Sequence, residues 1–232
     1  MNFQEKINIY HRLECGQANG LCVVIDVLRA FTTAAFAFAK GAQEIILVAE
    51  PEDAFRKLSN DRSLILMGEQ EGNPIEGFHY GNSPTEISEV SLEGRRLVQR
   101  TSSGTQGVVV CPQASFMLIS SFVVAEATLK RIVEINPPSV SFIVTGRKNG
   151  DEDYALAQYL QKRLLGETVQ AQPFLERVLT SPAAARMLTA DPKNYKFGKE
   201  DLKLSVQIDR FPFAMEVFQS SSGFTARKHL SM

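Results

Sequence analysis

An acid, a base and two hydroxyl groups stand together at the end of an apolar run near the N-terminus. In "LCVVIDVLRAFTTA" (21–34), Asp26 and Arg29 follow five apolar residues, and Thr32 and Thr33 come next. A carboxylate at a strand end can bind a metal ion or accept a proton, and an arginine offers donors that suit phosphate or carboxylate. The same residues could instead form a buried ion pair, with Asp26 capping the next helix and the threonines as ordinary helix residues. This stretch alone leaves both interpretations open.

Further polar groups follow other strand-like runs. They are Glu69 after "LILMG", Asn82 and Ser83 in "GNSP", the turn Thr101, Ser102, Ser103, Gly104 and Thr105, and the acids Asp151, Glu152 and Asp153. Carboxylates with waters and phosphate oxygens are the ligands of Mg²⁺, and a glycine-containing turn can aim N–H groups at an oxyanion. Each group also has an ordinary structural interpretation: a solvated loop residue, a helix N-cap, a polar turn, or acids that suit a helix N-terminus.

Several well-known catalytic patterns are missing from the chain. It has no G-x-x-x-x-G-K-[ST] loop, no G-x-G-x-x-G fingerprint and no G-x-S-x-G elbow, and Leu28 stands where a D-x-D phosphoenzyme motif needs an acid. The three histidines have no partners at metal-binding spacing. These absences argue against nucleotide-binding, serine-hydrolase and histidine-metal chemistry.

Composition predicts a globular cytoplasmic protein. The chain has 232 residues, 44% of them hydrophobic, with a formal net charge of −1, so neither nucleic acid nor a membrane surface is an expected partner. The N-terminus lacks a secretory signal pattern, and the apolar runs are shorter than the ~20 residues that span a bilayer. Three cysteines without a C-x-x-C motif argue against a disulfide scaffold and suit a reducing cytoplasm.

Strand-like and helix-like segments alternate along most of the chain. Apolar runs recur at 7–10, 21–27, 44–49, 64–69, 96–101, 107–111 and 140–146, and helix-like segments at 30–40, 51–59, 121–135 and 151–165. Continuous apolar strands are typical of sheets covered on both faces. The alternation therefore predicts an α/β fold with a mixed, mostly parallel sheet and helices on both faces.

Two segments depart from this rhythm. Residues 70–94 are rich in glycine and proline, and a long irregular loop in a compact fold is usually functional. From about residue 172 the sequence predicts short helices, loops and a late strand, a small C-terminal, mainly helical portion. We expect a single domain over 1–232, in which this last part forms a smaller subregion.

Five motifs in one order carry a family resemblance. "VVIDVLRAFTT", the Gly-Glu pair at 68–69, "GNSP", "TSSGT" and "GRKNGDED", with the late "DLKLSVQID", resemble the 2-phosphosulfolactate phosphatase family, also called ComB. The resemblance implies a magnesium-dependent phosphohydrolase with the ComB-like α/β fold, which releases phosphate from 2-phosphosulfolactate on a route to coenzyme M. A small anionic phosphorylated substrate is then the expected partner, and a homodimer stays open.

The resemblance also implies roles for individual residues. Asp26, Arg29 and Glu69 would be catalytic, and Mg²⁺ would be held by Asp26, Glu69, Glu152 and Asp153. The phosphate or the substrate would be bound by Thr32, Thr33, Asn82, Ser83, Thr101, Ser102, Ser103, Gly104 and Thr105. A metal ion and an arginine together neutralise charge on a transferring phosphoryl group.

The chain departs from the family pattern at a few positions. Gln70 stands where the pattern has arginine, Ser103 and Val124 stand where it has asparagine, and "YALAQ" follows Glu152-Asp153 where a Cys-Ala-Gly-like run is expected. These departures motivate an alternative, a non-catalytic descendant that binds an anionic metabolite or a partner protein. In a third interpretation, the polar strand ends are only caps and ion pairs.

Overall fold

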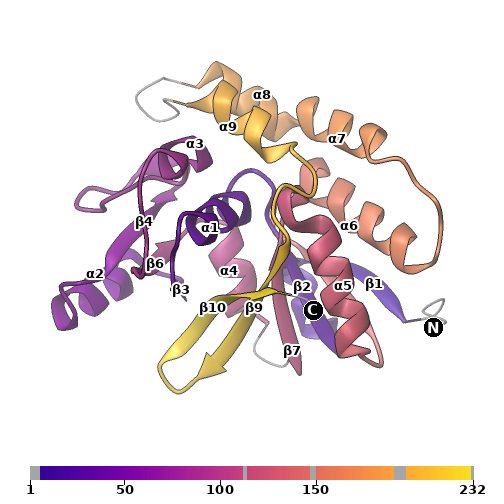
Figure 1. Ribbon diagram of the computed structural model, residues 1–232, viewed down its shortest axis with the longest axis horizontal. Helices are drawn as coiled ribbons and strands as arrows, with labels where there is room; N and C mark the ends of the chain where they lie inside the picture. The colour runs from indigo at the N-terminus through magenta and orange to yellow at the C-terminus, as the bar shows by residue number, and fades with distance from the viewer. Residues whose placement is uncertain (1–5, 112–113, 147–149, 191–196, 231–232) are drawn as a thin grey trace.

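The computed structural model describes residues 6–111, 114–146, 150–190 and 197–230. Within them, ten strands form one sheet in the order β1-β8-β2-β7-β9-β10-β3-β6-β4-β5 (Figure 1). The strands are β1 (Ile7–His11), β2 (Leu21–Ile25), β3 (Glu44–Val48), β4 (Ile65–Gln70), β5 (Asn73–Pro74), β6 (Arg96–Arg100), β7 (Phe116–Ser120), β8 (Val140–Val144), β9 (Phe213–Ser220) and β10 (Gly223–Leu230). The α-helices are α1 (Ala30–Ala39), α2 (Pro51–Asn60), α3 (Pro84–Ser88), α4 (Gly104–Val109), α5 (Ala125–Ile135), α6 (Asp151–Leu164), α7 (Gln172–Leu179), α8 (Pro182–Thr189) and α9 (Gly198–Ser205), with 3₁₀ turns η1 (Arg12–Gln17) and η2 (Phe122–Val124).

The sheet consists of two parallel sets of strands that run in opposite directions. One set is β1, β8, β2 and β7, and the other is β3, β6 and β4. The hairpin β9–β10 lies between them and is antiparallel to both, so three successive antiparallel pairings reverse the direction. In a flat sheet, the carboxyl ends of the two sets would lie at opposite edges.

Sheet twist reduces this separation. Neighbouring strands rotate by roughly 20–25° each, so the six pairings between β2 and β4 accumulate a rotation of about 120–150°. This twist turns the two sets toward each other, and residues that follow β2 and end β4 line one cavity. The carboxyl ends of both sets therefore contribute to a single site.

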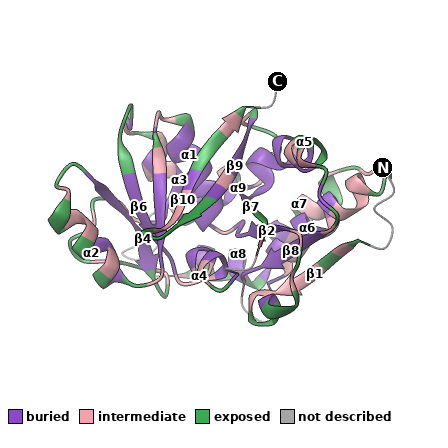
Figure 2. Ribbon diagram, turned by 90° about the horizontal axis from the view of Figure 1, so that it is seen from below, coloured by how far each residue is buried: buried purple, intermediate pink, exposed green. Residues whose placement is uncertain are grey.

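Helices cover both faces of the sheet. Cys22 and Val24 of β2 face a core shared with α1, while Leu21, Val23 and Ile25 face a second core shared with α5 and α6. A third, smaller core packs α2 against β3, β4 and β6. The strands β2, β3, β4, β6, β7 and β8 are accordingly buried along most of their length, whereas β10 is mostly half-buried or exposed (Figure 2). The predicted α/β fold, with a large mixed sheet and helices on both faces, is confirmed.

Most predicted elements have their expected type, with three exceptions. The apolar run 107–111 is wrong as a strand, because residues 104–109 form helix α4, while strand β7 at 116–120 was not predicted. Residues 172–205 do contain α7, α8 and α9, but the chain then returns to the middle of the sheet as β9 and β10. A C-terminal portion that is mainly helical is therefore not confirmed.

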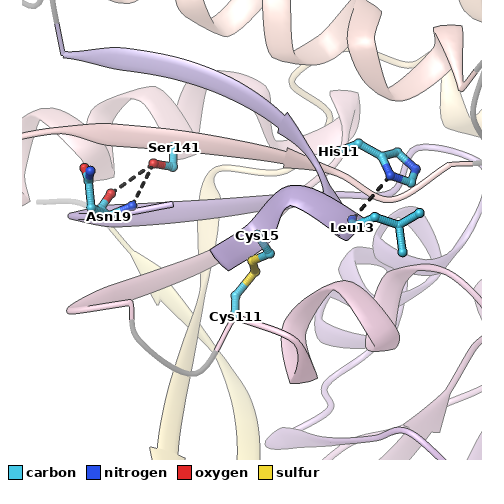
Figure 3. Close-up of a disulfide and its surroundings, with 6 residues drawn as sticks. All are labelled: His11, Leu13, Cys15, Asn19, Cys111 and Ser141. Carbon is cyan, nitrogen blue, oxygen red and sulfur yellow. Dashed lines mark hydrogen bonds between the residues drawn. A yellow bond between two sulfur atoms is a disulfide. The ribbon is translucent and has the colours of Figure 1, made fainter. Parts of the chain in front are cut away.

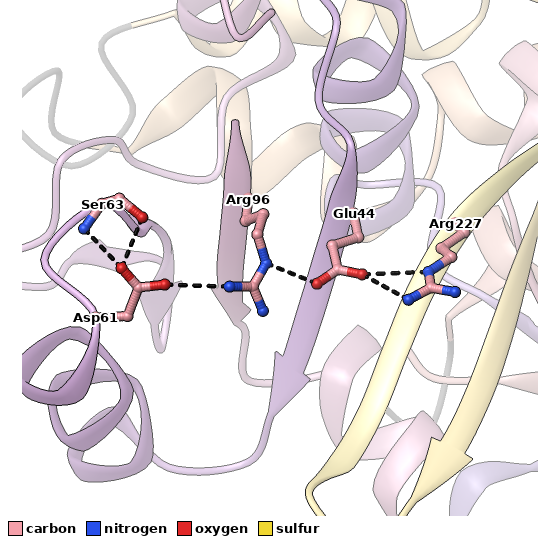
Figure 4. A network of polar contacts seen from close by, with 5 residues as sticks. All are labelled: Glu44, Asp61, Ser63, Arg96 and Arg227. Atoms are coloured by element: carbon pink, nitrogen blue, oxygen red, sulfur yellow. Dashed lines mark hydrogen bonds and ion pairs between the residues drawn. The ribbon is translucent and has the colours of Figure 1, made fainter. Parts of the chain in front are cut away.

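A chain of ion pairs joins β10 to the strands beside it. Glu44 on β3 accepts hydrogen bonds from Arg96 on β6 at 2.8 Å and from Arg227 on β10 at 2.9 Å (Figure 4). Arg96 also donates to Asp61 at 3.1 Å, and Asp61 accepts from the Ser63 hydroxyl at 2.6 Å. These side chains fix the position of the hairpin against β3 from the surface of the sheet.

The cysteines differ from the expectation of reduced thiols. Cys15 in η1 and Cys111, just after α4, form a disulfide across 96 residues of sequence, with their Cα atoms 5.8 Å apart (Figure 3). The local sequence does not predict this pair, because η1 and the end of α4 become neighbours only in the folded protein. Cys22 is a buried free thiol.

None of the helices within the described residues combines the length and the apolar character needed to cross a membrane.

Candidate active site

A cavity of about 110 Å³ lies where the carboxyl ends of β2, β4 and β8 approach the segment 172–205. Seven of the predicted site residues line it: Asp26, Arg29, Glu69, Asn82, Ser103, Glu152 and Asp153. A neighbouring cavity of about 180 Å³ shares Arg29, Glu69 and Asn82 with the first and adds Ser83. The structure therefore gathers residues from all five sequence motifs, the "GE" pair at the end of β4 included, around one space.

Asp26 follows β2 and is held by the start of α1. Its Oδ1 accepts a hydrogen bond from the Ala30 amide at 3.0 Å, as the capping interpretation predicts, and its Oδ2 accepts from the Thr145 hydroxyl at 3.3 Å. Burial, together with the negative charges of Glu69 and Glu152, raises the pKa of Asp26 to about 7. A cation bound beside this carboxylate would stabilise its ionised form, so the environment of Asp26 favours cation binding.

Gly104, the first residue of α4, packs against Asp26. A Cβ atom at this position would lie 2.9 Å from Asp26 Oδ2 and 2.6 Å from the Ala30 Cβ atom. Both distances are shorter than van der Waals contact, so only glycine permits the approach. The turn 101–105 is thereby brought directly against the carboxylate of Asp26.

Asp153, in the first turn of α6, holds two strand ends together. Its Oδ1 accepts from the Val27 amide at 2.8 Å, and its Oδ2 accepts from the Thr145 and Gly146 amides at 3.1 and 2.8 Å. Burial and the charges of Asp26 and Glu152 hold the pKa of Asp153 well above its usual range. These bonds join the loops after β2 and β8 beneath the cavity.

Two buried oxygens on the cavity wall accept no hydrogen bond from the part of the chain that the structure describes. They are Glu152 Oε2 and Asn82 Oδ1. Burial raises the pKa of Glu152, and the charge of Arg186 partly offsets this rise. Oxygen acceptors left without donors suit a hard cation such as Mg²⁺. Within the described ranges, however, no three Asp, Glu, His or Cys side chains already converge as a ligand cage.

Glu69 organises the turn after β6. Its Oε1 accepts from the Ser102 amide at 2.6 Å, and its Oε2 accepts from the Gly72 amide at 2.5 Å. Thr101 and Thr105 bond to each other, since the Thr105 amide donates to Thr101 Oγ1 at 3.1 Å and the Thr101 amide donates to Thr105 Oγ1 at 2.9 Å. Their hydroxyls close the turn, and Ser103 is the turn residue that lines the cavity.

Thr32 and Thr33 lie inside α1 and are fully buried away from the cavity. The Thr32 hydroxyl donates to the carbonyl of Val27, in the segment between β2 and α1, at 2.8 Å. This placement does not support the expected contact of the two threonines with an anion.

Arg29 pairs with Asp201 of α9 rather than with Asp26. Arg29 Nη1 donates to Asp201 Oδ2 at 2.6 Å, and both side chains are buried. Asp201 Oδ1 also accepts from the Ser83 hydroxyl at 2.7 Å and from the Thr85 amide at 3.0 Å. Asp201 was not predicted as a site residue, although it opens the late "DLKLSVQID" motif that supports the family resemblance.

The remaining cavity residues were also not predicted. They are Leu28, Glu71, Gly72, Gly146, Ala183, Arg186 and Met187. Ala183, Arg186 and Met187 lie three and four residues apart on α8, so one face of this helix forms a wall of the cavity. No chemical pattern in the sequence marks these three residues of α8, because they reach the site only through the packing of residues 172–205.

Comparison with known proteins identifies the family. Residues 7–219 match the family model described as 2-phosphosulpholactate phosphatase. A probable 2-phosphosulfolactate phosphatase of Bacillus subtilis is 31% identical over 199 residues, covering 85% of this chain and 86% of the relative. Proteins of the same description from Clostridium acetobutylicum and Clostridium perfringens are 36% identical over 119 residues and 29% identical over 199 residues. They cover 51% of each chain in the first case, and 79% of this chain and 80% of the relative in the second. The matched region includes every motif residue described above, and the chain therefore belongs to the 2-phosphosulpholactate phosphatase family.

Proposed function

We propose that the protein is a Mg²⁺-dependent phosphatase that releases phosphate from 2-phosphosulfolactate or a closely similar small acidic phosphoester. The observation that carries this proposal is the lining of the 110 Å³ cavity, where the carboxylates of Asp26, Glu69, Glu71, Glu152 and Asp153 stand beside two arginines. An anionic phosphoester would be repelled by these carboxylates unless a cation accompanied it. Burial raises the pKa values of Asp26 and Glu152, and for Asp26 the negative charges of Glu69 and Glu152 add to this rise.

Asp26 and Glu152 are the carboxylates best suited to hold the metal ion. Among the described residues, Glu152 keeps a buried oxygen without a partner, and Asp26 Oδ2 has only the longer bond to Thr145. Mg²⁺ commonly takes one or two carboxylates and completes its shell with water and phosphate oxygens, so a preformed cage is not needed. When bound, the ion supplies positive charge to the transferring phosphoryl group.

The other residues have positioning and binding roles in this proposal. The carboxylate oxygens of Asp153 and Glu69 accept hydrogen bonds from backbone amides, so these residues fix the loops rather than contact the substrate. Arg29, held by Asp201, donates to the phosphate oxygens, and Ser103 contributes a donor from the turn. Water attacks phosphorus in line with the ester oxygen, and the P–O bond to that oxygen breaks. One proton of the water ends on the ester oxygen, which leaves as the hydroxyl group of the hydroxy acid, and the water oxygen stays in the inorganic phosphate.

The departures from the family pattern fall mostly outside the cavity. Gln70 is exposed and does not line the cavity, and Val124 lies fully buried in the apolar core. Of the single-residue departures, Ser103 alone reaches the cavity wall. The alternative of a non-catalytic binding protein therefore gains no support from this site.

The test is phosphate release from a panel of phosphorylated small acids, with Mg²⁺ and with EDTA. We expect Mg²⁺-dependent release by the wild-type protein and a loss of at least 100-fold in Asp26→Asn, on the scale of removing a key electrostatic group. The control is Asp53→Asn, which removes a carboxylate of α2 on the protein surface. Full activity in Asp26→Asn would refute the assigned site, and no release from any member of the panel would refute the phosphatase activity.

A further inference from the structure

Arg186 is the second positive charge on the wall of the cavity. It lies on α8 between Ala183 and Met187, which are both buried and line the same cavity. Helix α8 is capped at its N-terminus by Ser181, whose buried hydroxyl oxygen accepts from the Ala184 amide at 3.1 Å, and Ala184 and Met187 pack into the core shared with α5 and α6. The side chain of Arg186 is thus carried by a well-anchored helix that forms one side of the site.

The two cavity arginines differ in their partners. Arg29 is buried and pairs at 2.6 Å with Asp201, whose negative charge offsets its own. Arg186 is exposed, and no ion pair or hydrogen bond engages it in the part of the chain that the structure describes. Its charge acts at a distance on the carboxylate of Glu152, which lines the same cavity, and its N–H donors are available to a bound molecule.

A substrate of the proposed kind carries acid groups besides its phosphate. 2-Phosphosulfolactate has a carboxylate and a sulfonate, and neither reacts. In the proposed function, the metal ion and Arg29 neutralise the charge of the phosphoryl group. The carboxylate and the sulfonate then face the carboxylates of the cavity wall. The family pattern has an arginine at position 70, but Gln70 carries no charge and does not line the cavity.

From this arrangement we infer that Arg186 binds a non-reacting acid group of the substrate and so determines specificity for acidic phosphoesters. A guanidinium matches the two oxygens of a carboxylate or sulfonate with paired donors. The inference rests on the proposed function, since it concerns the substrate of that same site. It assigns the recognition of the acid to α8, while the strand ends act on the phosphate.

The test compares two esters that share a three-carbon skeleton with phosphate on the middle carbon. 2-Phosphosulfolactate carries two acids, and glycerol 2-phosphate carries neutral hydroxyls in their place. For Arg186→Ala we expect KM for the acidic ester to rise roughly 10- to 100-fold, the effect of losing a hydrogen bond between charged groups. The value of kcat should change little, and kcat/KM for glycerol 2-phosphate should stay within about threefold of wild type.

Two further measurements sharpen the comparison. Arg186→Lys keeps the charge without the paired donors and should recover part of the loss. 2-Phospholactate, which keeps the carboxylate and lacks the sulfonate, identifies the acid that is bound: dependence on Arg186 assigns the carboxylate, and independence assigns the sulfonate. The control is Lys203→Met, which removes an exposed cation of α9 that does not line the cavity, and it should leave both esters unaffected.

Calorimetric binding of sulfolactate in the presence of Mg²⁺ separates this inference from the catalytic proposal. Weaker binding by Arg186→Ala would support the inference even if no ester were hydrolysed. Equal changes in KM for both esters, an unchanged KM for the acidic ester, or equal binding of sulfolactate by wild type and variant would overturn it. Absence of sulfolactate binding by the wild-type protein would overturn it as well.

Discussion

Asp201 offers the sharpest test of how the site is held together. Its carboxylate is fully buried and accepts from Arg29, from the Ser83 hydroxyl and from the Thr85 amide. In Asp201→Asn, one carboxylate oxygen becomes an NH₂ group. If the remaining oxygen serves Ser83 and Thr85, the NH₂ group faces the donors of Arg29.

The expected loss follows from the burial of the pair. Removing one partner of a buried ion pair costs about 3–5 kcal/mol, because the other charge stays buried and loses the charge that compensated it. Arg29 would also move from the cavity wall, and a displacement of about 1 Å at a reacting centre lowers kcat/KM by roughly 100-fold. We therefore expect both the free energy of unfolding and phosphate release to fall.

Urea denaturation gives the free energy of unfolding, and phosphate release gives kcat/KM. Glu200→Gln is the matched control, because it removes a negative charge from the neighbouring exposed position of α9. It should change the free energy of unfolding by no more than about 0.5 kcal/mol. The double variant Arg29→Met/Asp201→Asn should be less destabilised than the sum of the single variants. Equal unfolding free energies for Asp201→Asn and Glu200→Gln would refute the reasoning.

Three further predictions concern the rest of the structure. Gly104→Ala should lose about 1–3 kcal/mol of stability and most Mg²⁺-dependent activity, because its Cβ atom would press on Asp26 and Ala30. Urea titration measures the stability and phosphate release measures the activity. A variant with unaltered stability and activity would contradict the packing. Cys15→Ser should lower the free energy of unfolding by about 2–4 kcal/mol, and dithiothreitol should act on wild type in the same way, whereas no change under either condition would argue against the disulfide. The raised pKa of Asp26, about 7 against 3.8, means that the metal-free protein binds more protons folded than unfolded between these values, so its stability should fall as pH rises, by at most about 1.4 kcal/mol per pH unit from this group. Thermal melts in EDTA from pH 5 to 8 test this, Mg²⁺ should raise Tm more at pH 8 than at pH 6, and a metal-free Tm that climbs with pH would count against it.

The sequence predicted the strands that carry the site better than it predicted their neighbours. Strands β2, β4 and β8 are continuous apolar runs ended by polar residues, and such runs report burial on both faces directly. The run 107–111 has the same appearance, but the reciprocal bonds of Thr101 and Thr105 start a helix before it. A short apolar run cannot distinguish a buried strand from a buried helix, so the local contacts decided this case.

The same division applies to the site residues. Asp26, Glu69 and Glu152 were predictable because each follows or ends a strand, or opens a helix, at the edge where ligands bind. Arg186 and the partner of Arg29 were not predictable, because both depend on where residues 172–205 pack. That packing is a tertiary property without a signature in local spacing.

The position of the β9–β10 hairpin also has a consequence for the order of folding. Among the described strands, the set that contains β2 and the set that contains β4 are joined in the sheet only through this hairpin. The ribosome makes the hairpin after all the strands that it joins. Until residues 213–230 insert, the nascent chain contains two separate half-sheets, and the edges that the hairpin will pair are unpaired. Unpaired strand edges are prone to aggregation. We therefore expect the metal site to be among the last features to form during biosynthesis. Truncation before residue 213 should leave two separate parts of the site, not an assembled site that binds more weakly.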